Sequence, residues 1–172
     1  MILFKTIKTP YVDTWYDYSK TATFKSGGRW NSAGIAAMYT STNPQNAMLE
    51  LGNYCSSPKM ANTLYKLLIF EVKELRLFEV DVTQLPSNWD RKPHGGACST
   101  IGDRVLSDVN YDGLLIPSAT INKDAATHPV NSVRKAAYAN VVMNISHMDE
   151  TDMRVIDVCS PVFSTQMFSA KK

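Results

Sequence analysis

The segment Gly27-Gly28-Arg29-Trp30-Asn31 combines residue types that suit the binding of a phosphate group. The two glycines let the backbone approach a ligand closely, and an arginine placed there donates two parallel hydrogen bonds to phosphate oxygens. The alternative is a turn in which Arg29 stacks on Trp30 at the surface, because glycine pairs are frequent in turns. The segment alone therefore leaves a phosphate site and a plain turn open.

Tyr39 and Glu50 add an aromatic ring and a carboxylate further along the chain. Tyr39 ends the apolar run 35–39, where its ring face suits a planar cationic ring such as nicotinamide. Glu50 lies between apolar neighbours in an expected helix, and a half-buried carboxylate stabilises an oxocarbenium-like centre or holds a ribose hydroxyl. The alternatives are a core tyrosine and a glutamate that is ion-paired or exposed.

Ser118 follows the apolar run Gly113–Pro117 without the glycines of a nucleophile elbow, which argues against a hydrolase nucleophile. We expect Ser118 to donate a hydrogen bond to a ligand, or simply to end a strand. The three histidines have no metal-ligand spacing, and the glycine pairs match neither a phosphate-binding loop nor a dinucleotide fingerprint. The sequence therefore predicts no metal site and no nucleotide domain of the doubly wound type.

Composition excludes several classes of protein. The 172 residues carry 18 Lys and Arg against 16 Asp and Glu, and this balance gives no general attraction to nucleic acid or to a membrane. Three cysteines without a Cys-x-x-Cys pair suggest free thiols in a reducing compartment. Neither a signal peptide nor a membrane-spanning run is recognisable, so we expect a cytoplasmic site of action, in the producing cell or in a target cell.

Periodicity and turn residues predict one α+β domain over residues 1–172, with many short strands and two clear helices. One helix begins at Thr42-Asn43-Pro44 and runs to about Tyr54, and the other begins at Ser99 or Thr100 and runs through Leu106. Asn122–Ala137 is polar and longer than a usual loop. The expected strands are Ile2–Ile7, Ile35–Tyr39, Leu64–Val72, Leu75–Val82, Gly113–Pro117, Tyr138–Asn144 and Met153–Val158.

The order of several short motifs resembles the RES family of bacterial toxins, from about Phe24 to about Asp157. Each motif is weak by itself, but their agreement in order is far more specific. The motifs are Gly27-Gly28-Arg29-Trp30-Asn31, Met38-Tyr39-Thr40-Ser41, Ala47-Met48-Leu49-Glu50, Leu85-Pro86-Ser87-Asn88-Trp89, Ile101-Gly102-Asp103, Leu115-Ile116-Pro117-Ser118-Ala119 and Asn140-Val141-Val142-Met143-Asn144 with His147.

The resemblance implies an ADP-ribosyltransferase-like fold in which a split central β-sheet with flanking helices forms a cleft for NAD+. It implies that Arg29 holds the phosphates of NAD+ and that Tyr39 stacks near the nicotinamide. Glu50 would orient the ribose and stabilise positive charge as the glycosidic bond breaks. Ser118 and Asn140 would line the cleft, with Ser118 donating to the ligand. NAD+ is then the substrate, and no cofactor is expected.

Three functions remain open from the sequence. The first is cleavage of the nicotinamide–ribose bond of NAD+ by a glycohydrolase or phosphorylase, and the second is ADP-ribosylation of a protein. The third is a non-catalytic nucleotide-binding module. The resemblance also implies an Xre-type antitoxin as partner, which we expect to block the cleft near Arg29 or Glu50, and it implies no direct binding of nucleic acid.

Three positions depart from the family pattern. Val105-Leu106 stands where the family often has Trp-Leu, and Asn144-Ile145 where it usually has Asn-Pro. Asn122–Ala137 resembles an insertion before Asn140. The insertion matters most, because it can reshape the rim of the cleft or the surface that meets a partner.

Overall fold

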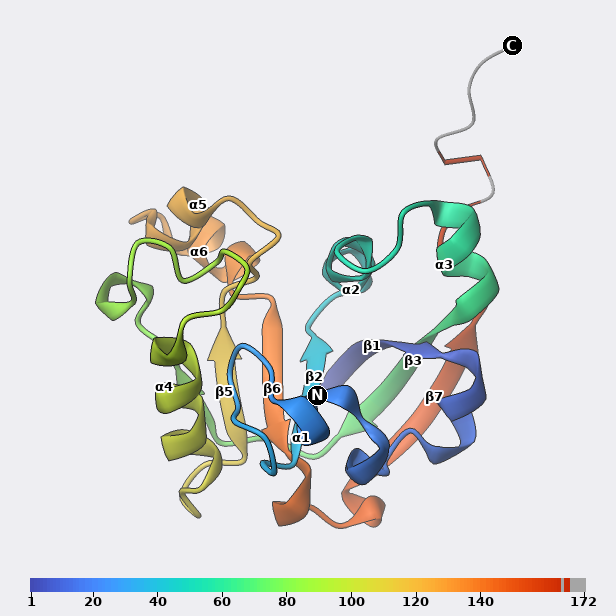
Figure 1. Ribbon diagram of the computed structural model, residues 1–172, viewed down its shortest axis with the longest axis horizontal. Coiled ribbons are helices and arrows are strands. Elements are labelled where there is room, and N and C mark those ends of the chain that lie inside the picture. Colours follow the sequence, from blue (N-terminus) through green and yellow to red (C-terminus); the bar gives the residue numbers. More distant parts are fainter. Residues whose placement is uncertain (165, 168–172) are drawn as a thin grey trace.

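The computed structural model describes residues 1–164 and 166–167 and contains one mixed sheet. Its strand order is β4-β5-β6-β2-β1-β3-β7 (Figure 1), and β4 and β5 run parallel while all other neighbours are antiparallel. The strands are β1 (Ile2–Lys8), β2 (Ala37–Ser41), β3 (Tyr65–Val72), β4 (Leu77–Glu79), β5 (Gly113–Ile116), β6 (Asn140–Asn144) and β7 (Met153–Cys159).

The sheet nearly separates into two halves between β1 and β2. These strands share a single residue pair, Phe4 opposite Ser41. In contrast, β1 pairs with β3 from Ile2 to Lys8, and β2 pairs with β6 over its full length. The two halves therefore diverge on either side of one contact, which is the split sheet that the resemblance implies.

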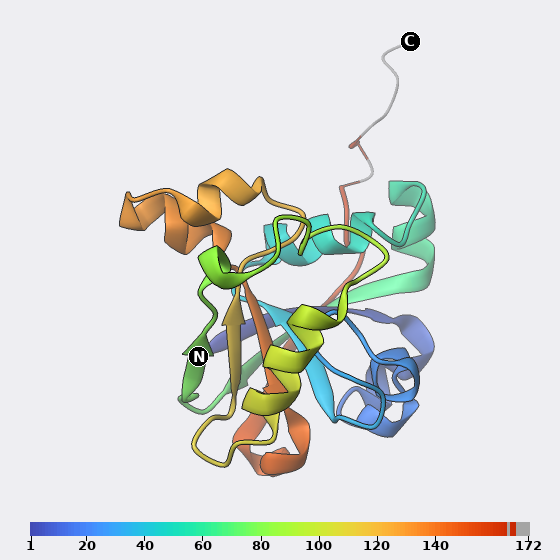
Figure 2. The same ribbon diagram turned by 60° about the vertical axis from the view of Figure 1, so that its left-hand side comes forward.

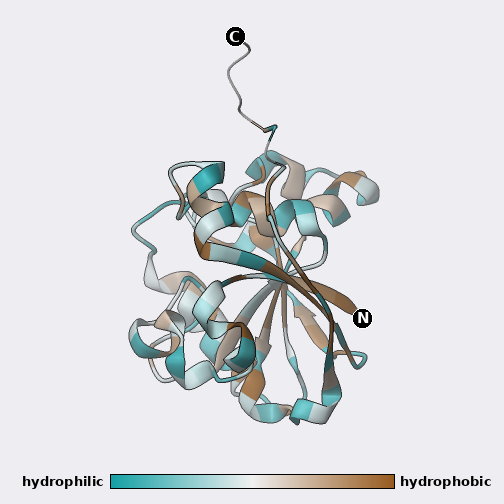
Figure 3. Ribbon diagram, turned by 90° about the vertical axis from the view of Figure 1, so that its right-hand side faces the viewer, coloured by the Kyte–Doolittle hydropathy of each residue, from teal (hydrophilic) through white to brown (hydrophobic). Residues whose placement is uncertain are grey.

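Both faces of the sheet are buried at its centre, as alternation along β6 shows. Val142 belongs to a core cluster under α4 (Gly96–Leu106), which crosses that face of the sheet in Figure 2. Its neighbours Val141 and Met143 belong to a second cluster on the opposite face. Figure 3 shows the apolar strands in the interior and more hydrophilic colours on the helices. Side chains of successive residues point to opposite faces of a strand, so one strand supplies two cores.

The helices are α1 (Ala22–Ser26), α2 (Pro44–Gly52), α3 (Pro58–Leu64), α4, α5 (Lys123–Thr127) and α6 (Asn131–Ala137). The side chain of Asn43 caps α2 as expected, but the helix ends at Gly52, before Tyr54. The next helix, α3, begins after Ser57, whose hydroxyl caps it. None of the helices in the described part of the chain has the length and apolar character that a bilayer crossing requires.

The predicted start of α4 is wrong. The helix begins at Gly96 instead of Ser99 or Thr100, and both hydroxyls donate to the Gly96 carbonyl, at 3.0 and 2.9 Å. Serine and threonine inside a helix make this backward hydrogen bond when they do not cap its start. The sequence therefore suggested capping residues that instead lie within the first turn.

The polar segment Asn122–Ala137 is also different from the expected loop, since it folds into α5 and α6. The Asn122 side chain accepts a hydrogen bond from the Asp124 amide and begins α5, and Pro129 lies between the two helices. Helices this short bury few residues, here Ala126 and Ala137, so they show little apolar periodicity in the sequence.

Four of the predicted strands differ from the observed ones by a single residue at one end, and β6 begins at Asn140 instead of Tyr138. The bounds of β2 and β4 differ most from the prediction. β2 is Ala37–Ser41 instead of residues 35–39, and it extends to the contact with β1. β4 is limited to Leu77–Glu79, because Asp81 accepts hydrogen bonds from the Thr83 amide and hydroxyl and turns the chain into a short 3₁₀ helix. Buried Val80 and Val82 made this segment look like a longer strand.

Gly102 allows α4 to pack directly on the backbone of Trp30. A Cβ at Gly102 would lie 1.8 Å from the Trp30 carbonyl oxygen, whereas one at Gly96 would meet nothing within 4 Å. We expect Gly102→Ala to lower the free energy of unfolding by about 2–3 kcal/mol, with Gly96→Ala nearly neutral. Urea unfolding followed by tryptophan fluorescence measures both, and equal effects would contradict the close packing.

Candidate active site

A cavity of about 820 Å³ opens at the split between the two halves of the sheet. This volume lies within the range of small-molecule sites. Its walls come from β1, β2, α2, β6 and the segments 22–30 and 90–94, and they include Arg29, Tyr39, Glu50 and Asn140. The structure thus brings together four of the five residues that the sequence singled out.

The Glu50 carboxylate is held by side chains from two other parts of the chain. Its Oε1 accepts hydrogen bonds from the Ser118 hydroxyl at 2.7 Å and from the Asn140 amide nitrogen at 2.8 Å. Its Oε2 lies 3.4 Å from the amide nitrogen of Asn53. One oxygen is therefore fixed from behind, and the carboxylate faces the cavity from α2.

Ser118 lies behind this carboxylate and does not line the cavity, although its neighbours Pro117 and Ala119 do. The residue is only 2% exposed. Its hydroxyl also lies 2.7 Å from the Thr120 hydroxyl and accepts from the Thr120 amide. Its hydroxyl donates to Glu50 and so orients the carboxylate, and the expected donation from Ser118 to a ligand stays a prediction.

Tyr39 presents its ring to the cavity while its hydroxyl is occupied. The hydroxyl donates to Asn31 Oδ1 at 2.8 Å and accepts from the Trp30 amide at 2.9 Å. A Cβ at Gly28 would lie 2.6 Å from this oxygen, so this glycine is required for the close approach. Burial raises the pKa of Tyr39 above its usual range, so the hydroxyl stays neutral.

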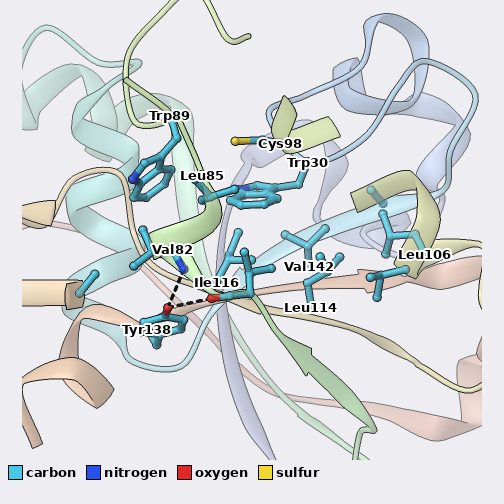
Figure 4. Close-up of a cluster of buried hydrophobic side chains, with 14 of the residues drawn as sticks. Trp30, Val82, Leu85, Trp89, Cys98, Leu106, Leu114, Ile116, Tyr138 and Val142 are labelled. Carbon is cyan, nitrogen blue, oxygen red and sulfur yellow. Dashed lines mark hydrogen bonds between the residues drawn. The ribbon is translucent and has the colours of Figure 1, made fainter. Parts of the chain in front are cut away.

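Arg29 binds the backbone of the segment 89–91. Its guanidinium donates to the carbonyl oxygens of Trp89, of Asp90 at 3.0 Å and of Arg91 at 3.1 Å. The expected alternative, stacking on Trp30, is wrong: the guanidinium lies 5.9 Å from the Trp89 ring, and Trp30 is 1% exposed in the core. Figure 4 shows Trp30 and Trp89 in the buried hydrophobic cluster under α4.

Lys5 is a cavity residue that the sequence analysis missed. Its ammonium donates to the Tyr39 carbonyl at 3.3 Å across the split. Burial lowers the pKa of Lys5 to about 8. The available signal was a lysine between the apolar residues Leu3 and Ile7 of the first strand, where both neighbours on the same face are buried.

The rim of the cavity adds a second cation that was missed. The Lys92 ammonium lies 4.3 Å from the centre of the Tyr54 ring, and both residues line the cavity. Apart from its tyrosines, the ionisable lining residues are Lys5, Arg29, Glu50, Asp90, Lys92 and His94, with three full positive charges against two negative ones. The described residues contain no cluster of three or more His, Cys, Asp or Glu that could hold a metal ion.

A model of the RES domain family matches residues 3–162. The chain belongs to the RES domain family. Toxin Res of Photorhabdus laumondii is 28% identical to it over 121 residues, which are 70% of this chain and 76% of that protein. Toxin Res of Pseudomonas putida is 31% identical over 112 residues, covering 63% of this chain and 73% of that protein.

One further relative and one solved structure bear on the fold of this RES protein. A Prs ADP-ribosylating toxin of a Sphingobium species is 24% identical over 145 residues, 83% of this chain and 81% of that protein. A chain in the solved M. tuberculosis MbcT-MbcA toxin-antitoxin complex superposes with a TM-score of 0.64 and 14% identity, covering 92% of this chain and 82% of that one. The expected ADP-ribosyltransferase-like α+β fold is confirmed.

The contacts of Arg29 predict a local effect of substitution in this RES protein. Lysine presents one compact ammonium instead of a planar fork, so Arg29→Lys cannot hold the carbonyls of the segment 89–91 together. We expect the backbone amides of the segment 89–91 to exchange with solvent about tenfold faster in Arg29→Lys than in the parent protein. Hydrogen-exchange mass spectrometry measures this, with Arg91→Lys as the matched control because that side chain is exposed. Unchanged exchange in Arg29→Lys would contradict the role.

Proposed function

We propose that this RES protein is a toxin that breaks the nicotinamide–ribose bond of NAD+. The observation that carries the proposal is the Glu50 carboxylate, which Ser118 and Asn140 hold at the wall of a cavity of suitable size. The names of the related toxins support the same conclusion. A fixed carboxylate suits a reaction in which positive charge develops on a sugar.

The proposed reaction requires little chemistry from the protein. The bond between C1′ of the ribose and N1 of nicotinamide breaks, and its electron pair leaves with the ring, which becomes neutral. C1′ then carries oxocarbenium-like charge, which Glu50 stabilises, and an oxygen of water or phosphate bonds to it. Water loses a proton to solvent in this step. Orientation and electrostatics supply the acceleration because nicotinamide is already a good leaving group.

The charges around the cavity fit two parts of NAD+, the anionic pyrophosphate and the cationic nicotinamide riboside. Lys5, Arg29 and Glu50 line the same cavity. The two cations would hold the pyrophosphate, and Glu50 would stabilise the positive charge that develops on the ribose. The ring of Tyr39 offers a surface for stacking of the nicotinamide. The remaining donors of the Arg29 guanidinium support its assignment to phosphate, because a guanidinium has five N–H groups and three hydrogen bonds to carbonyls are present.

We further propose that an antitoxin of the Xre type is the partner of this toxin. The structural neighbour comes from a toxin-antitoxin complex, which supports a partner protein. Arg29 and Glu50 line an open cavity, so a polar or charged segment of the antitoxin inserted there would exclude NAD+. We assign the toxin to the cytoplasm, where NAD+ is available, and expect no direct contact with nucleic acid.

ADP-ribosylation of a protein is the second candidate. The Sphingobium relative, named a Prs ADP-ribosylating toxin, favours it. Both reactions break the same bond and differ in whether water, phosphate or a protein side chain accepts the ribosyl group. The helices α5 and α6 form the segment that resembled an insertion. We infer that a protein acceptor would bind there.

Incubation of the purified protein with NAD+ tests the proposal. We expect free nicotinamide with water or with inorganic phosphate as acceptor, and at least a hundredfold lower rate for Glu50→Gln, which keeps the shape but removes the charge. Glu74→Gln, at an exposed position, is the control and should retain full activity. Radiolabel transferred to a protein would favour the second candidate. If no acceptor gives nicotinamide release, a non-catalytic module remains.

The low pKa of Lys5 predicts how the affinity for NAD+ depends on pH. Lys5 is charged below about pH 8 and loses its charge above it, so the KM for NAD+ should rise severalfold between pH 7 and pH 9.5. Lys5→Met should start from the higher KM and lack this rise, whereas Lys8→Met, at an exposed position of the same strand, should behave like the parent protein. An unchanged profile in Lys5→Met would exclude Lys5 from the phosphate site.

A further inference from the structure

A buried asparagine, Asn46, lies one helical turn before Glu50 on α2 and is 2% exposed. Its amide nitrogen has three oxygen partners, the side-chain oxygen of Asn140 at 2.5 Å, the hydroxyl of Ser41 at 2.9 Å and the carbonyl of Ala139 at 3.3 Å. All three acceptors therefore lie on one side of the Asn46 amide.

The side-chain oxygen of Asn46, in contrast to its nitrogen, has no hydrogen-bond partner among the described residues. This Oδ1 is the one buried side-chain nitrogen or oxygen without a hydrogen-bond partner among the residues that the structure describes. Leaving a buried acceptor unpaired costs stability. Rotating the amide by half a turn would be worse, because it would bring Oδ1 against the oxygens of Asn140 and Ala139, neither of which can donate. The orientation of Asn46 is thus fixed by the acceptors that it must serve.

The amide of Asn140 is fixed in turn. Its Oδ1 accepts from Asn46 and from the Ser41 hydroxyl at 3.1 Å, so its Nδ2 must point the other way. In that direction lies Glu50 Oε1, at 2.8 Å. A flipped Asn140 would place its oxygen against the carboxylate and its nitrogen against the nitrogen of Asn46.

We propose that Asn46 is a positioning residue that keeps the donor end of Asn140 directed at the Glu50 carboxylate. Asn46, Asn140 and Glu50 form a relay in which each group leaves its neighbour one allowed orientation. Asn46 does not line the cavity, so it acts on the reaction only through Asn140 and Glu50. Its catalytic consequence rests on the proposed function, but the relay itself is a property of the folded protein.

Replacing the hydrogen-bond donor at residue 46 by an acceptor tests the relay. Asn46→Asp has nearly the same shape but offers only acceptors, so Asn140 must turn its nitrogen toward residue 46 and its oxygen toward Glu50. We expect at least a tenfold lower kcat for nicotinamide release with a much smaller change in KM. The matched control is Gln45→Asp, which adds the same charge to the first turn of α2 at an exposed position.

A double-mutant cycle tests the relay without any activity. The Glu50→Gln substitution introduces an amide that can donate to a flipped Asn140. Asn46→Asp should therefore change the unfolding equilibrium constant at least tenfold less when Glu50→Gln is present. This is a coupling of at least about 1.4 kcal/mol. Chemical denaturation of the four proteins gives this value. Absence of coupling would overturn the relay, whatever the activity assays show.

Two carboxylates one turn apart also repel each other directly, and a third substitution separates this effect. In the Asn140→Ala background the relay is broken while residues 46 and 50 keep their charges. We expect the coupling to disappear there. Coupling that persists at full size in Asn140→Ala would show direct repulsion and would overturn the proposal. If the coupling is present in the parent background and disappears in Asn140→Ala, but the parent protein releases no nicotinamide, the relay stands and the proposed reaction is rejected.

Discussion

The separation of β1 from β2 is the constraint on which the site depends. Two neighbouring strands that stay paired satisfy their backbone groups and leave no space between them. Here one pair, Phe4 with Ser41, joins the halves, and the backbone beyond it needs other partners. The Lys5 ammonium supplies one of them by donating to the Tyr39 carbonyl. The same opening produces the cavity and places a cation in its wall.

The carboxylate site shows why distant segments must meet at this opening. The two partners of Glu50 Oε1 are 68 and 90 residues away along the chain. Ser118 follows the end of β5 and Asn140 begins β6, and these strands pair with residue 116 opposite residue 140. Pairing of β6 with β2 then brings both beside α2, which follows β2 directly. The geometry at Glu50 is therefore a consequence of the strand register.

The sequence predicted much of the fold but only part of the site. Strong local signals, such as the Asn43-Pro44 helix start and the apolar runs of β1 and β3, gave elements that the structure confirms. The weaker elements failed because tertiary contacts determine them: α5 and α6 bury little apolar surface. Motif order brought forward Arg29 and Glu50, which the structure places around one cavity.

The remaining site residues were missed for a physical reason. Lys5 gains its importance from the split, and Asn46 from contacts with residues about ninety positions away, which no local pattern contains. The sequence singled out Ser118 but not the partner of its hydroxyl, because that partner depends on where Glu50 lies in space. Residue identity was thus readable from the chain, whereas the partner of each hydrogen bond required the fold.

The charges of the cavity are held by neutral groups, and this explains how they stay available. Among the described residues, none of the five ion pairs includes Lys5, Arg29 or Glu50. Backbone carbonyls hold the two cations, and a hydroxyl and an amide hold the carboxylate. Pairing Glu50 with either cation would cancel both charges before a ligand arrived. Neutral dipoles fix the same groups in place and leave their charge to act on the ligand.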